Sequence, residues 1–512
     1  MTHAWTLRAA RALAAAALLP LGACGGDGAS ARPHVILITL DTVRADHLSC
    51  YGGNTGDTPA LDGIASAGAL FEQAISVSGL TPTSHATILT GRFQYEHGLR
   101  VLAGPGGYRL EDVPTLATAL KAEGYRTGAV HSAFPVSSTF GFDEGFDHFD
   151  SLEGKLTERG NTSTKVGWDV ASLQRRSDET TARALRWMST ALEEDDGPIF
   201  LWLHYWDPHD PVVLPPTEEF ERLFYDEVET ELRDESSRSY AAELRWQDQN
   251  LGALFRGLDG LGALDEALLA ITSDHGQGLG DGLQIHGWGA HRMLYREQVH
   301  VPLLLRGPGV PAGARIPAQV RTADIAPTLL ELAGLDPVPI LGKYIAGESL
   351  VPLLDAGAPS GDRVAYGEQV SGYDDNAGMR VRRPDAAFLY MVSDGEWKVI
   401  YRPHMPENSE LFHVSVDPRE TQNVRERHPE QYLRLMEDLA LRNPWVLEPF
   451  SGPGGYSESD QLGGLGYTAV EQGSGSWWWT CPSDPAIHED VRGVCPDCGR
   501  TLVPAGTWSE PK

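Results

Sequence analysis

The feature that most constrains the fold is a series of apolar, β-branched runs that alternate with segments of helical period. Five runs have the length and composition of buried parallel strands; they occupy residues 34–41, 125–132, 198–207, 267–276 and 301–309. Helical patterns lie between them at 58–68, 113–124 and 177–194. Because strands and helices alternate, the sequence predicts an α/β domain built on a doubly wound, mostly parallel sheet.

Side chains that can bind metal follow three of these runs, at the point where each run ends. Asp41 closes the first run, Asp207 and His209 follow the third, and Asp274 and His275 follow the fourth. In open α/β sheets the carboxyl ends of parallel strands share one edge, and sites form there. Carboxylates together with an imidazole suit a divalent cation. The sequence therefore predicts a cation-binding site at this edge.

The segment LTPTSHATILTGR, residues 80–92, is rich in hydroxyl groups. Taken alone, it is typical of a polar turn that opens a helix, since Ser and Thr are good N-caps. Beside a divalent cation, however, the hydroxyl of Thr81 would have a lowered pKa and act as a nucleophile. The start of a helix favours an anion, and His85 and Arg92 add hydrogen-bonding or positive groups. This combination predicts an anionic tetrahedral ester as the substrate.

The pattern of predicted secondary structure changes after residue 350. Residues 394–403 have the pattern of a strand pair, and residues 428–442 have that of an amphipathic helix. We therefore expect a smaller α+β subdomain at 351–449, behind a catalytic α/β domain at 33–350. Residues 450–476 are rich in Gly and Ser, which is typical of a linker.

The N-terminus has the pattern of a targeting segment. A positively charged start precedes an apolar stretch at 13–21, too short to span a bilayer, and the residues LGAC end at Cys24. We expect a bacterial lipoprotein signal peptide over 1–23, with a plain secretory signal as the alternative, then a flexible tether at 24–32. A lipid on Cys24 would anchor the protein in the cell envelope, outside the cytoplasm. The net charge of −30 argues against a nucleic-acid partner.

Several segments, taken in order, resemble the sulfatase family of the alkaline phosphatase superfamily. They include HVILITLDTVRADHLSCYGG, PTSHATILTGR, ALKAEGYRTGAV, YWDPHDP, TSDHGQGLGD, HGWGAHRMLYREQVHVPLLLRGPG and ELFHVSVDPRETQN, and the similarity spans residues 32–440. The resemblance implies an alkaline-phosphatase-like fold. It also implies hydrolysis of a sulfate or phosphate ester on a small molecule or glycan.

The same resemblance implies a metal site. Asp41 and Asp274 resemble metal ligands, and His275 falls where many relatives have Asn. Thr42 takes the place of a second Asp, and Thr81 completes the set beside the cation. We expect one divalent cation in the active site, either Ca²⁺, Mg²⁺, Mn²⁺ or Zn²⁺. The alternative is a second cation held by Asp207 and His209, with His204 and His286 as spare ligands.

The segment PTSHATILTGR falls where the family has its nucleophile signature, C/S-x-P-S-R-x-x-x-x-T-G-R. Thr81 falls at the nucleophile position, His85 at the Arg position, and Arg92 at the end, where it would brace the helix. His209 resembles the histidine that contacts the sulfate or the leaving group, and His291 falls where relatives carry an active-site Lys. Typical sulfatases convert the signature Cys or Ser to formylglycine. Because the residue is Thr here, no formylglycine is expected.

The C-terminal end, at 477–507, resembles a heavy-metal-binding module. Cys481, Cys495 and Cys498 match the cysteines of that module, whereas its Met and His ligands are replaced. Three thiolates and one further ligand suit a tetrahedral site, so zinc or another heavy metal is expected there. A reduced, structural cysteine cluster is the alternative.

Together these patterns predict a metal-dependent hydrolase of sulfate esters or related phosphate esters, with Thr81 as the nucleophile. Thr nucleophiles are familiar in phosphorus chemistry within the superfamily. A phosphodiesterase, phosphonate monoester hydrolase or phosphoryl transferase is therefore the first alternative. An inactive sulfatase-like protein that binds metal at the cell surface is the second.

Overall fold

The structure is a computed structural model. It describes residues 32–443, apart from 54–56, 103–108, 154–155, 159–165, 169–172, 196, 210–234, 280–290, 343–344, 356–362, 372–385 and 404, together with strands at 477–481, 484–489 and 503–507. The expected signal peptide and most of the expected tether lie outside the described residues. Among the described residues, no helix combines the length and the apolar character that a membrane span requires.

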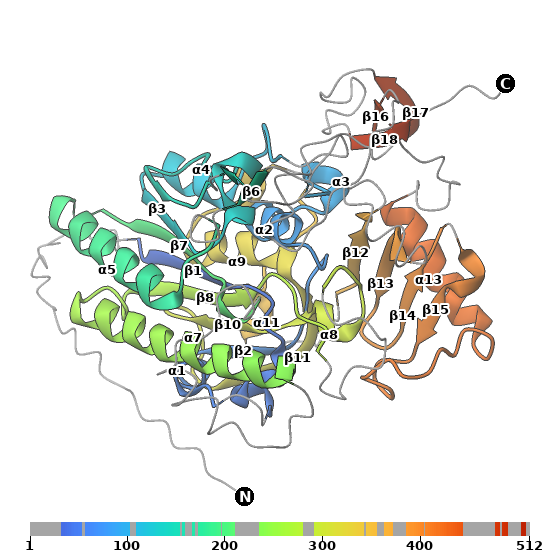
Figure 1. Cartoon of the computed structure of the whole chain (residues 1–512), viewed down its shortest axis with the longest axis horizontal. Helices are drawn as coiled ribbons and strands as arrows, with labels where there is room; N and C mark the ends of the chain where they lie inside the picture. Colours follow the sequence, from blue (N-terminus) through green and yellow to red (C-terminus); the bar gives the residue numbers. More distant parts are fainter. Residues whose placement is uncertain are drawn as a thin grey trace, which may run out of the picture. The chain divides into compact units, whose positions relative to one another are not determined.

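A nine-stranded sheet forms the centre of the main domain (Figure 1). Its strands are β1 (His34–Leu40), β2 (Ala69–Ile75), β3 (Arg126–His131), β4 (His148–Asp150), β7 (Ile199–Tyr205), β8 (Ala267–Ser273), β9 (His300–Val301), β10 (Leu303–Arg306) and β11 (Ala314–Arg321). The order is β11-β2-β10-β8-β1-β7-β3-β4, with β9 paired to β2. β1 runs parallel to both β7 and β8. The predicted mostly parallel sheet is confirmed, and β2 and β11 are strands that the periodicity did not predict.

The run at 301–309 is not a parallel strand, and that part of the prediction was wrong. β10 pairs antiparallel with both β8 and β2. Leu303 at its start lies opposite Thr272, near the carboxyl end of β8. The chain re-enters the sheet at the edge where β8 ends, so the next strand must run back in the opposite direction.

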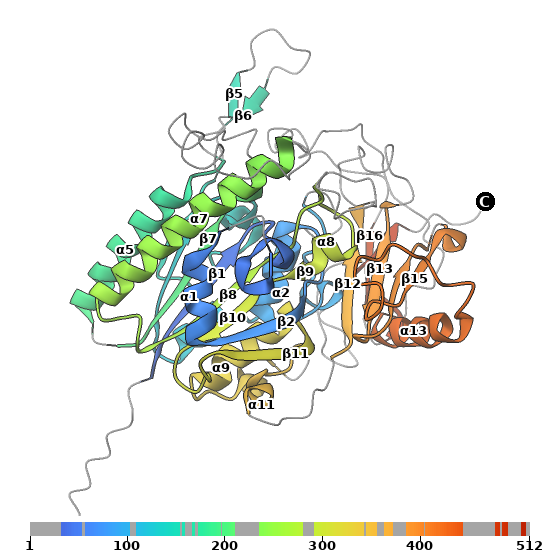
Figure 2. The same cartoon turned by 90° about the horizontal axis from the view of Figure 1, so that it is seen from below.

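Helices cover both faces of the sheet, as expected for a doubly wound fold (Figure 2). One face packs against α1 (Pro59–Ala67), α5 (Ser177–Glu194) and α7 (Glu235–Gly260), through an apolar cluster that includes Leu61, Met188 and Leu244. The other face packs against α2 (Thr81–Thr90), α4 (Leu116–Ala122) and α9 (Ile325–Leu332). The short helices are α3 (Gln94–His97), α8 (Arg296–Val299), α10 (Pro337–Leu341) and α11 (Val351–Leu354). The sheet is therefore packed against an apolar core on each face.

A four-stranded antiparallel sheet follows the main domain in sequence. It comprises β12 (Ala365–Gln369), β13 (Leu389–Ser393), β14 (Lys398–Tyr401) and β15 (Glu410–Phe412), in that order. The helix α13 (Pro429–Arg442) buries Leu435 and Leu439 in the cluster that this sheet forms. The predicted strand pair at 394–403 is a correction: the range holds only β14, whose hairpin partner β13 precedes it. Residues 394–397 form the turn instead, where Asp394 accepts hydrogen bonds from two backbone N–H groups.

Two smaller sheets complete the described backbone. The hairpin of β5 (Leu156–Glu158) and β6 (Val166–Trp168) belongs to a segment between β4 and α5. Near the C-terminus, β16 (Trp477–Cys481) pairs antiparallel with both β17 (Asp484–Glu489) and β18 (Val503–Thr507). Among the described residues near the C-terminus, these three strands form a small antiparallel sheet that includes Cys481.

Candidate active site

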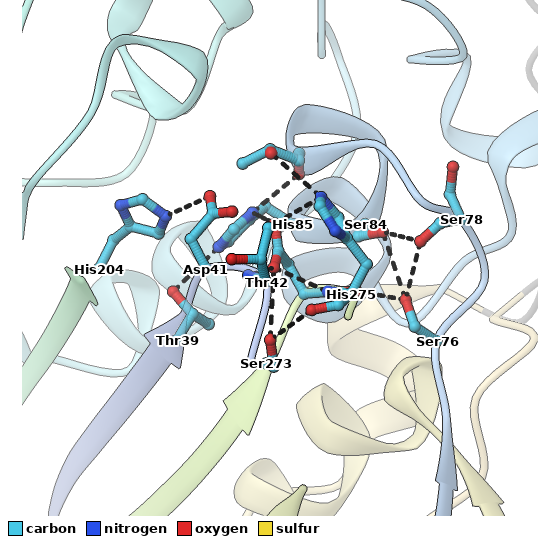
Figure 3. A network of polar contacts seen from close by, with 12 residues as sticks. Thr39, Asp41, Thr42, Ser76, Ser78, Ser84, His85, His204, Ser273 and His275 are labelled. Carbon is cyan, nitrogen blue, oxygen red and sulfur yellow. Dashed lines mark hydrogen bonds and ion pairs between the residues drawn. The ribbon is translucent and has the colours of Figure 1, made fainter. Parts of the chain in front are cut away.

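Two carboxylates and one imidazole meet at the carboxyl edge of the sheet (Figure 3). Asp41 follows β1, and Asp274 and His275 follow β8, so the parallel pairing of these two strands brings them together. One ligand atom from each of the three side chains lies within 4.8 Å of the others, and all three side chains are buried. Sequence reasoning from strand ends therefore located side chains that the fold does bring into one place.

The charges in this cluster are arranged as a cation site requires. Burial and the neighbouring Asp274 raise the pKa of Asp41 well above its ordinary value. Oδ1 of Asp41 and Oδ2 of Asp274 are buried and have no hydrogen-bond partner within the described residues. Two adjacent, buried carboxylates with free oxygens are costly unless a positive charge compensates them. The donor set of two carboxylates and an imidazole fits a divalent cation.

The backbone of the loop after β1 is held in an unusual conformation. Thr42 has a φ of 57°, a left-handed conformation that costs a β-branched residue of the order of 1–3 kcal/mol. Its N–H donates to Oδ1 of Asp274 at 3.2 Å, and its carbonyl accepts from the Tyr240 hydroxyl at 2.8 Å. The same Tyr240 oxygen accepts from the N–H of Arg44 at 3.0 Å. The Thr42 hydroxyl itself is buried without a partner among the described residues.

Thr81 is the first residue of α2. Its Oγ1 lies 3.3 Å from Nε2 of His275, and its hydroxyl slightly offsets the rise that burial gives the pKa of Asp41. The N-cap of α2 is Leu80, without a side-chain cap. The simpler interpretation of the hydroxyl-rich segment as an N-cap therefore does not describe Thr81: its hydroxyl faces the carboxylate cluster instead. Pro82 follows at a position where a helix lacks a bonded N–H in any case.

His85 lies one turn further along α2 and is fully buried. Its Nδ1 is 2.8 Å from the carbonyl oxygen of Thr81 and 3.7 Å from Oδ2 of Asp274. Its Nε2 is 3.0 Å from Oγ1 of Thr39, a contact that Figure 3 shows. Burial lowers the pKa of His85 to about 3, so the ring is neutral at ordinary pH.

Two further histidines, His209 and His291, lie in series beyond His275. The rings of His209 and His291 are 5.1 Å apart, and His291 stacks on His275 at 5.0 Å. His209 also stacks on Trp206 at 3.7 Å, and neither of its ring nitrogens has a hydrogen-bond partner in the described part of the chain. Nδ1 of His291 donates to the carbonyl of Gly79 at 3.0 Å, which leaves Nε2 on the far side of the ring. Burial lowers the pKa of both imidazoles.

Arg92 is placed apart from this group. It follows the opposite end of the ten-residue helix α2 from Thr81, and its Nη2 donates to the carbonyl of Leu341 at 2.8 Å. This contact ties the end of α2 to α10. The arrangement supports a bracing role for Arg92 at the end of α2.

The residues considered for a second cation are also separated. Both carboxylate oxygens of Asp207 accept hydrogen bonds from Ser177, one from its N–H at 3.0 Å and one from its hydroxyl. Nε2 of His204 lies 3.2 Å from Oδ2 of Asp41, and His286 lies outside the described residues. Within the described residues, Asp41, Asp274 and His275 form the one group of three close metal-binding side chains.

Sequence reasoning missed several residues that support the site. Oγ of Ser273 lies 2.5 Å from the carbonyl oxygen of Leu40 and 2.7 Å from that of His275, so its one hydrogen is donated to one of the two carbonyls in the turn after β8. Thr39 on β1 is the register partner of His204 on β7, which the sequence patterns suggested only as a spare ligand for a second cation. Both precede the strand ends where we looked for polar groups, so a polar side chain within an apolar strand was the available signal.

The described residues give little about the C-terminal cysteines. Cys481 ends β16, whereas Cys495 and Cys498 lie outside the described residues. Their metal binding remains a prediction from the sequence.

The comparisons with known proteins agree with this architecture. The sulfatase family profile matches residues 33–335, the profile named N-sulphoglucosamine sulphohydrolase, C-terminal, matches 284–442, and the heavy metal binding domain profile matches 479–505. N-acetylglucosamine-6-O-sulfatase of Bacteroides thetaiotaomicron is 26% identical, over 77% of this chain and 82% of that protein. Choline-sulfatase of Rhizobium meliloti is 23% identical, over 90% of this chain and 96% of that protein.

Solved structures share the fold. A protein in complex with its substrate D-glucosamine-2-N,6-O-disulfate has a TM-score of 0.62 at 22% identity, covering 82% of this chain and 99% of that one. The phosphonate monoester hydrolase of Agrobacterium radiobacter has a TM-score of 0.61 at 23% identity, covering 80% of this chain and 95% of that one. The family profile matches more than half of the chain, and the geometry of the site agrees with that match. The chain belongs to the sulfatase family, whose members are hydrolases of sulfuric and related esters, and carries a heavy metal binding domain at its C-terminal end.

Proposed function

We propose that the protein is a metal-dependent hydrolase of sulfate esters or related phosphate esters in which Thr81 is the nucleophile. The observation that carries this proposal is the position of Thr81 Oγ1, which lies 3.3 Å from Nε2 of His275 within the carboxylate cluster. An aliphatic hydroxyl is otherwise too weakly acidic to attack near neutral pH. Asp41, Asp274 and His275 would hold the cation, with the Thr42 hydroxyl as a further oxygen near them. A bound cation supplies Lewis acidity, which lowers the pKa of a hydroxyl beside it.

The residues of the chain then divide the chemistry among them. The oxygen of Thr81 forms a bond to the sulfur or phosphorus of the ester, while the bond to the leaving alcohol breaks. Oδ1 of Asp41, unpartnered among the described residues, would accept the departing hydroxyl proton. The ring nitrogens of His209 and Nε2 of His291 would stabilise the oxyanion or donate a proton to the leaving oxygen. Water then hydrolyses the Thr81 ester and restores the hydroxyl.

The relatives favour a sulfated small molecule or glycan as the substrate. The curated relatives above are named for N-acetylglucosamine 6-O-sulfate and choline sulfate, and one solved structure holds a disulfated glucosamine. The second candidate is hydrolysis of a phosphonate monoester or phosphodiester. Two observations favour it: the nucleophile is Thr, and a phosphonate monoester hydrolase shares the fold. We also propose that Thr81 stays unmodified, with no formylglycine, which the intact mass of the protein would show.

One experiment separates these candidates. The protein from residue 25 onward is stripped of metal and re-supplied with Ca²⁺, Mg²⁺, Mn²⁺ or Zn²⁺ in turn. Each preparation is assayed on an aryl sulfate, a phosphate monoester, a phosphodiester and a phosphonate monoester. The proposal expects cation-dependent turnover, and the ester with the highest kcat/KM decides between sulfur and phosphorus. Undiminished turnover by the metal-free protein would contradict the metal dependence.

We extend the proposal to the two ends of the chain. A lipid on Cys24 would keep the hydrolase on the outer side of the membrane. The C-terminal module would bind zinc or another heavy metal through Cys481, Cys495 and Cys498. Metal content of the wild-type protein and of a C495S/C498S double variant tests the second claim. The variant should lose one equivalent of metal and keep its turnover, because the tail supplies no group to the active site in this account. Equal metal content in the two proteins would contradict it.

A further inference from the structure

We propose that Thr39 is a positioning residue that selects the tautomer of His85 and, through it, fixes the first turn of the helix that carries Thr81. This inference rests on the proposed function, because it matters for turnover only if Thr81 is the nucleophile. Thr39 stands inside β1, two residues before Asp41. Neither the sequence patterns nor the family profiles point to it.

The first step is the proton on Nδ1 of His85. This atom lies 2.8 Å from the carbonyl oxygen of Thr81. A carbonyl oxygen can only accept a hydrogen bond, so this contact is a hydrogen bond only in the tautomer with the hydrogen on Nδ1. The same N–H lies 3.7 Å from Oδ2 of Asp274, which is a second negative neighbour that favours a hydrogen on this nitrogen.

The second step is the other nitrogen. In a neutral imidazole with Nδ1 protonated, Nε2 is an acceptor. Its neighbour at 3.0 Å is the hydroxyl of Thr39. That hydroxyl receives a hydrogen bond from Nε1 of Trp202 at 3.1 Å, since an indole nitrogen only donates. Thr39 therefore has one hydrogen of its own left to give.

The third step decides where that hydrogen goes. Two acceptors lie near Thr39 Oγ1: Nε2 of His85 at 3.0 Å and the carbonyl of Leu203 at 3.3 Å. If the hydrogen pointed at Leu203, the lone pairs of Nε2 and Oγ1 would face each other without a hydrogen between them. All of these groups are fully buried, so water cannot fill the gap. The complete chain runs from Trp202 to Thr39, to His85 and to the Thr81 carbonyl.

The opposite tautomer of His85 would break this series of hydrogen bonds at the Thr81 carbonyl. With the hydrogen on Nε2, the lone pair of Nδ1 would face the Thr81 carbonyl and the Asp274 carboxylate, both of which are negative. The ring would turn or the first turn of α2 would shift, and the hydroxyl of Thr81 would move relative to His275. Thr39 thus acts on the nucleophile from the sheet below it (Figure 3).

The test compares Thr39→Val, which keeps the shape and removes the hydroxyl, with Thr39→Ser, which keeps the hydroxyl. Thr127→Val is the matched control. Thr127 is another buried threonine of the sheet, near the amino end of β3, and its hydroxyl donates to the carbonyl of Gly145 at 2.8 Å. The protein is labelled with ¹⁵N-histidine, and the ring nitrogens of His85 are assigned by their loss in His85→Gln. The ¹⁵N shifts report directly which ring nitrogen carries the hydrogen.

We expect His85 to carry its hydrogen on Nδ1 in the wild type, in Thr39→Ser and in Thr127→Val, and to lose this uniform state in Thr39→Val. Turnover should fall roughly 10- to 100-fold in kcat for Thr39→Val with a small change in KM, whereas Thr39→Ser stays near wild type. A wild-type ring protonated on Nε2, or on both nitrogens, would overturn the proposal. So would a Thr39→Val protein with an unchanged tautomer. The ¹⁵N result does not depend on turnover, so failure of the proposed function would be seen separately, as full activity of Thr81→Ala.

Discussion

Nε2 of His204 lies 3.2 Å from Oδ2 of Asp41, and both side chains are completely buried. A carboxylate oxygen accepts, so the ring nitrogen donates, and Oδ1 of Asp41 is left without a partner among the described residues. His204 therefore holds Oδ2 of Asp41 in a hydrogen bond within the protein. This contact leaves Oδ1 as the oxygen of Asp41 that is available to a cation.

The role of His204 gives a first prediction. His204→Leu removes the donor and should weaken cation binding about 10- to 100-fold, the usual effect of losing the group that orients a metal ligand. His204→Gln keeps an N–H at a similar reach and should bind nearly as well as wild type. Titration calorimetry with the preferred cation measures both. The control is His300→Gln, because His300 is buried elsewhere and donates to the carbonyl of Glu72.

If the two His204 variants bound the cation equally well, the orienting role would be wrong. A stoichiometry that fell from two cations to one in His204→Gln would instead support the two-cation alternative.

The second prediction is that adding the cation reverses which protein is more stable to heat, wild type or Asp274→Asn. Without cation, Asp274→Asn should be more stable to heat than wild type at pH 7 and above, because burial and Asp274 are what raise the pKa of Asp41. With cation at 100 times its Kd, wild type gains about 2.7 kcal/mol from binding, and the variant gains much less. The wild type should then be the more stable protein. Thermal unfolding with and without cation tests this.

A surface carboxylate provides the comparison for Asp274. Asp265→Asn removes an exposed partner of Arg306 and should change neither curve by more than a few tenths of a kcal/mol. A wild-type unfolding temperature that does not respond to any cation would count against the metal site.

Glu243 predicts a pH dependence away from the cluster. It is buried in α7 without a hydrogen-bond partner in the described residues, and burial, with a smaller contribution from Asp207, raises its pKa from 4.5 to about 9. The folded state therefore holds a proton that the unfolded state releases between these values. The contribution of protonated Glu243 to the free energy of unfolding is therefore fully present below pH 4.5 and is lost as the pH rises toward 9.

Glu243→Gln should remove this loss. At pH 7 the variant should be more stable than wild type by on the order of 2 kcal/mol, and near pH 4.5 the two should agree. Denaturant unfolding at both pH values gives the comparison. A difference that is the same at the two pH values would show that Glu243 does not titrate in this window.

The sequence predicted the fold class because the signals for it are local. Apolar runs and helical periods reflect burial on one or both faces, and β1, β7 and β8 appear where the runs predict them. The direction of β10 was mispredicted because a short apolar run has the same pattern in a parallel and an antiparallel strand. The direction depends on the edge at which the chain re-enters the sheet, which is not a local property.

The site residues also fall into those that local sequence marks and those that depend on distant contacts. Asp41, Asp274, His275 and Thr81 follow strand ends or begin a helix, so position along the chain marked them. Thr39 and His204 are polar groups within apolar strands, and their partners are 46 residues and 163 residues away. Only the register of β1 against β7, and the packing of α2 on that face, bring these pairs together.

The most direct test of the central claim is the turnover of Thr81→Ala and Thr81→Ser beside wild type. Each is assayed on the best ester, with the preferred cation, and Thr127→Val serves as the control for loss of a buried hydroxyl. The account predicts that Thr81→Ala loses at least 1,000-fold in kcat, roughly the contribution of an activated nucleophile with its partners, and still binds the cation. Thr81→Ser should keep measurable turnover through its own hydroxyl. A Thr81→Ala protein with full turnover would contradict the account, because another group would then have to attack the ester.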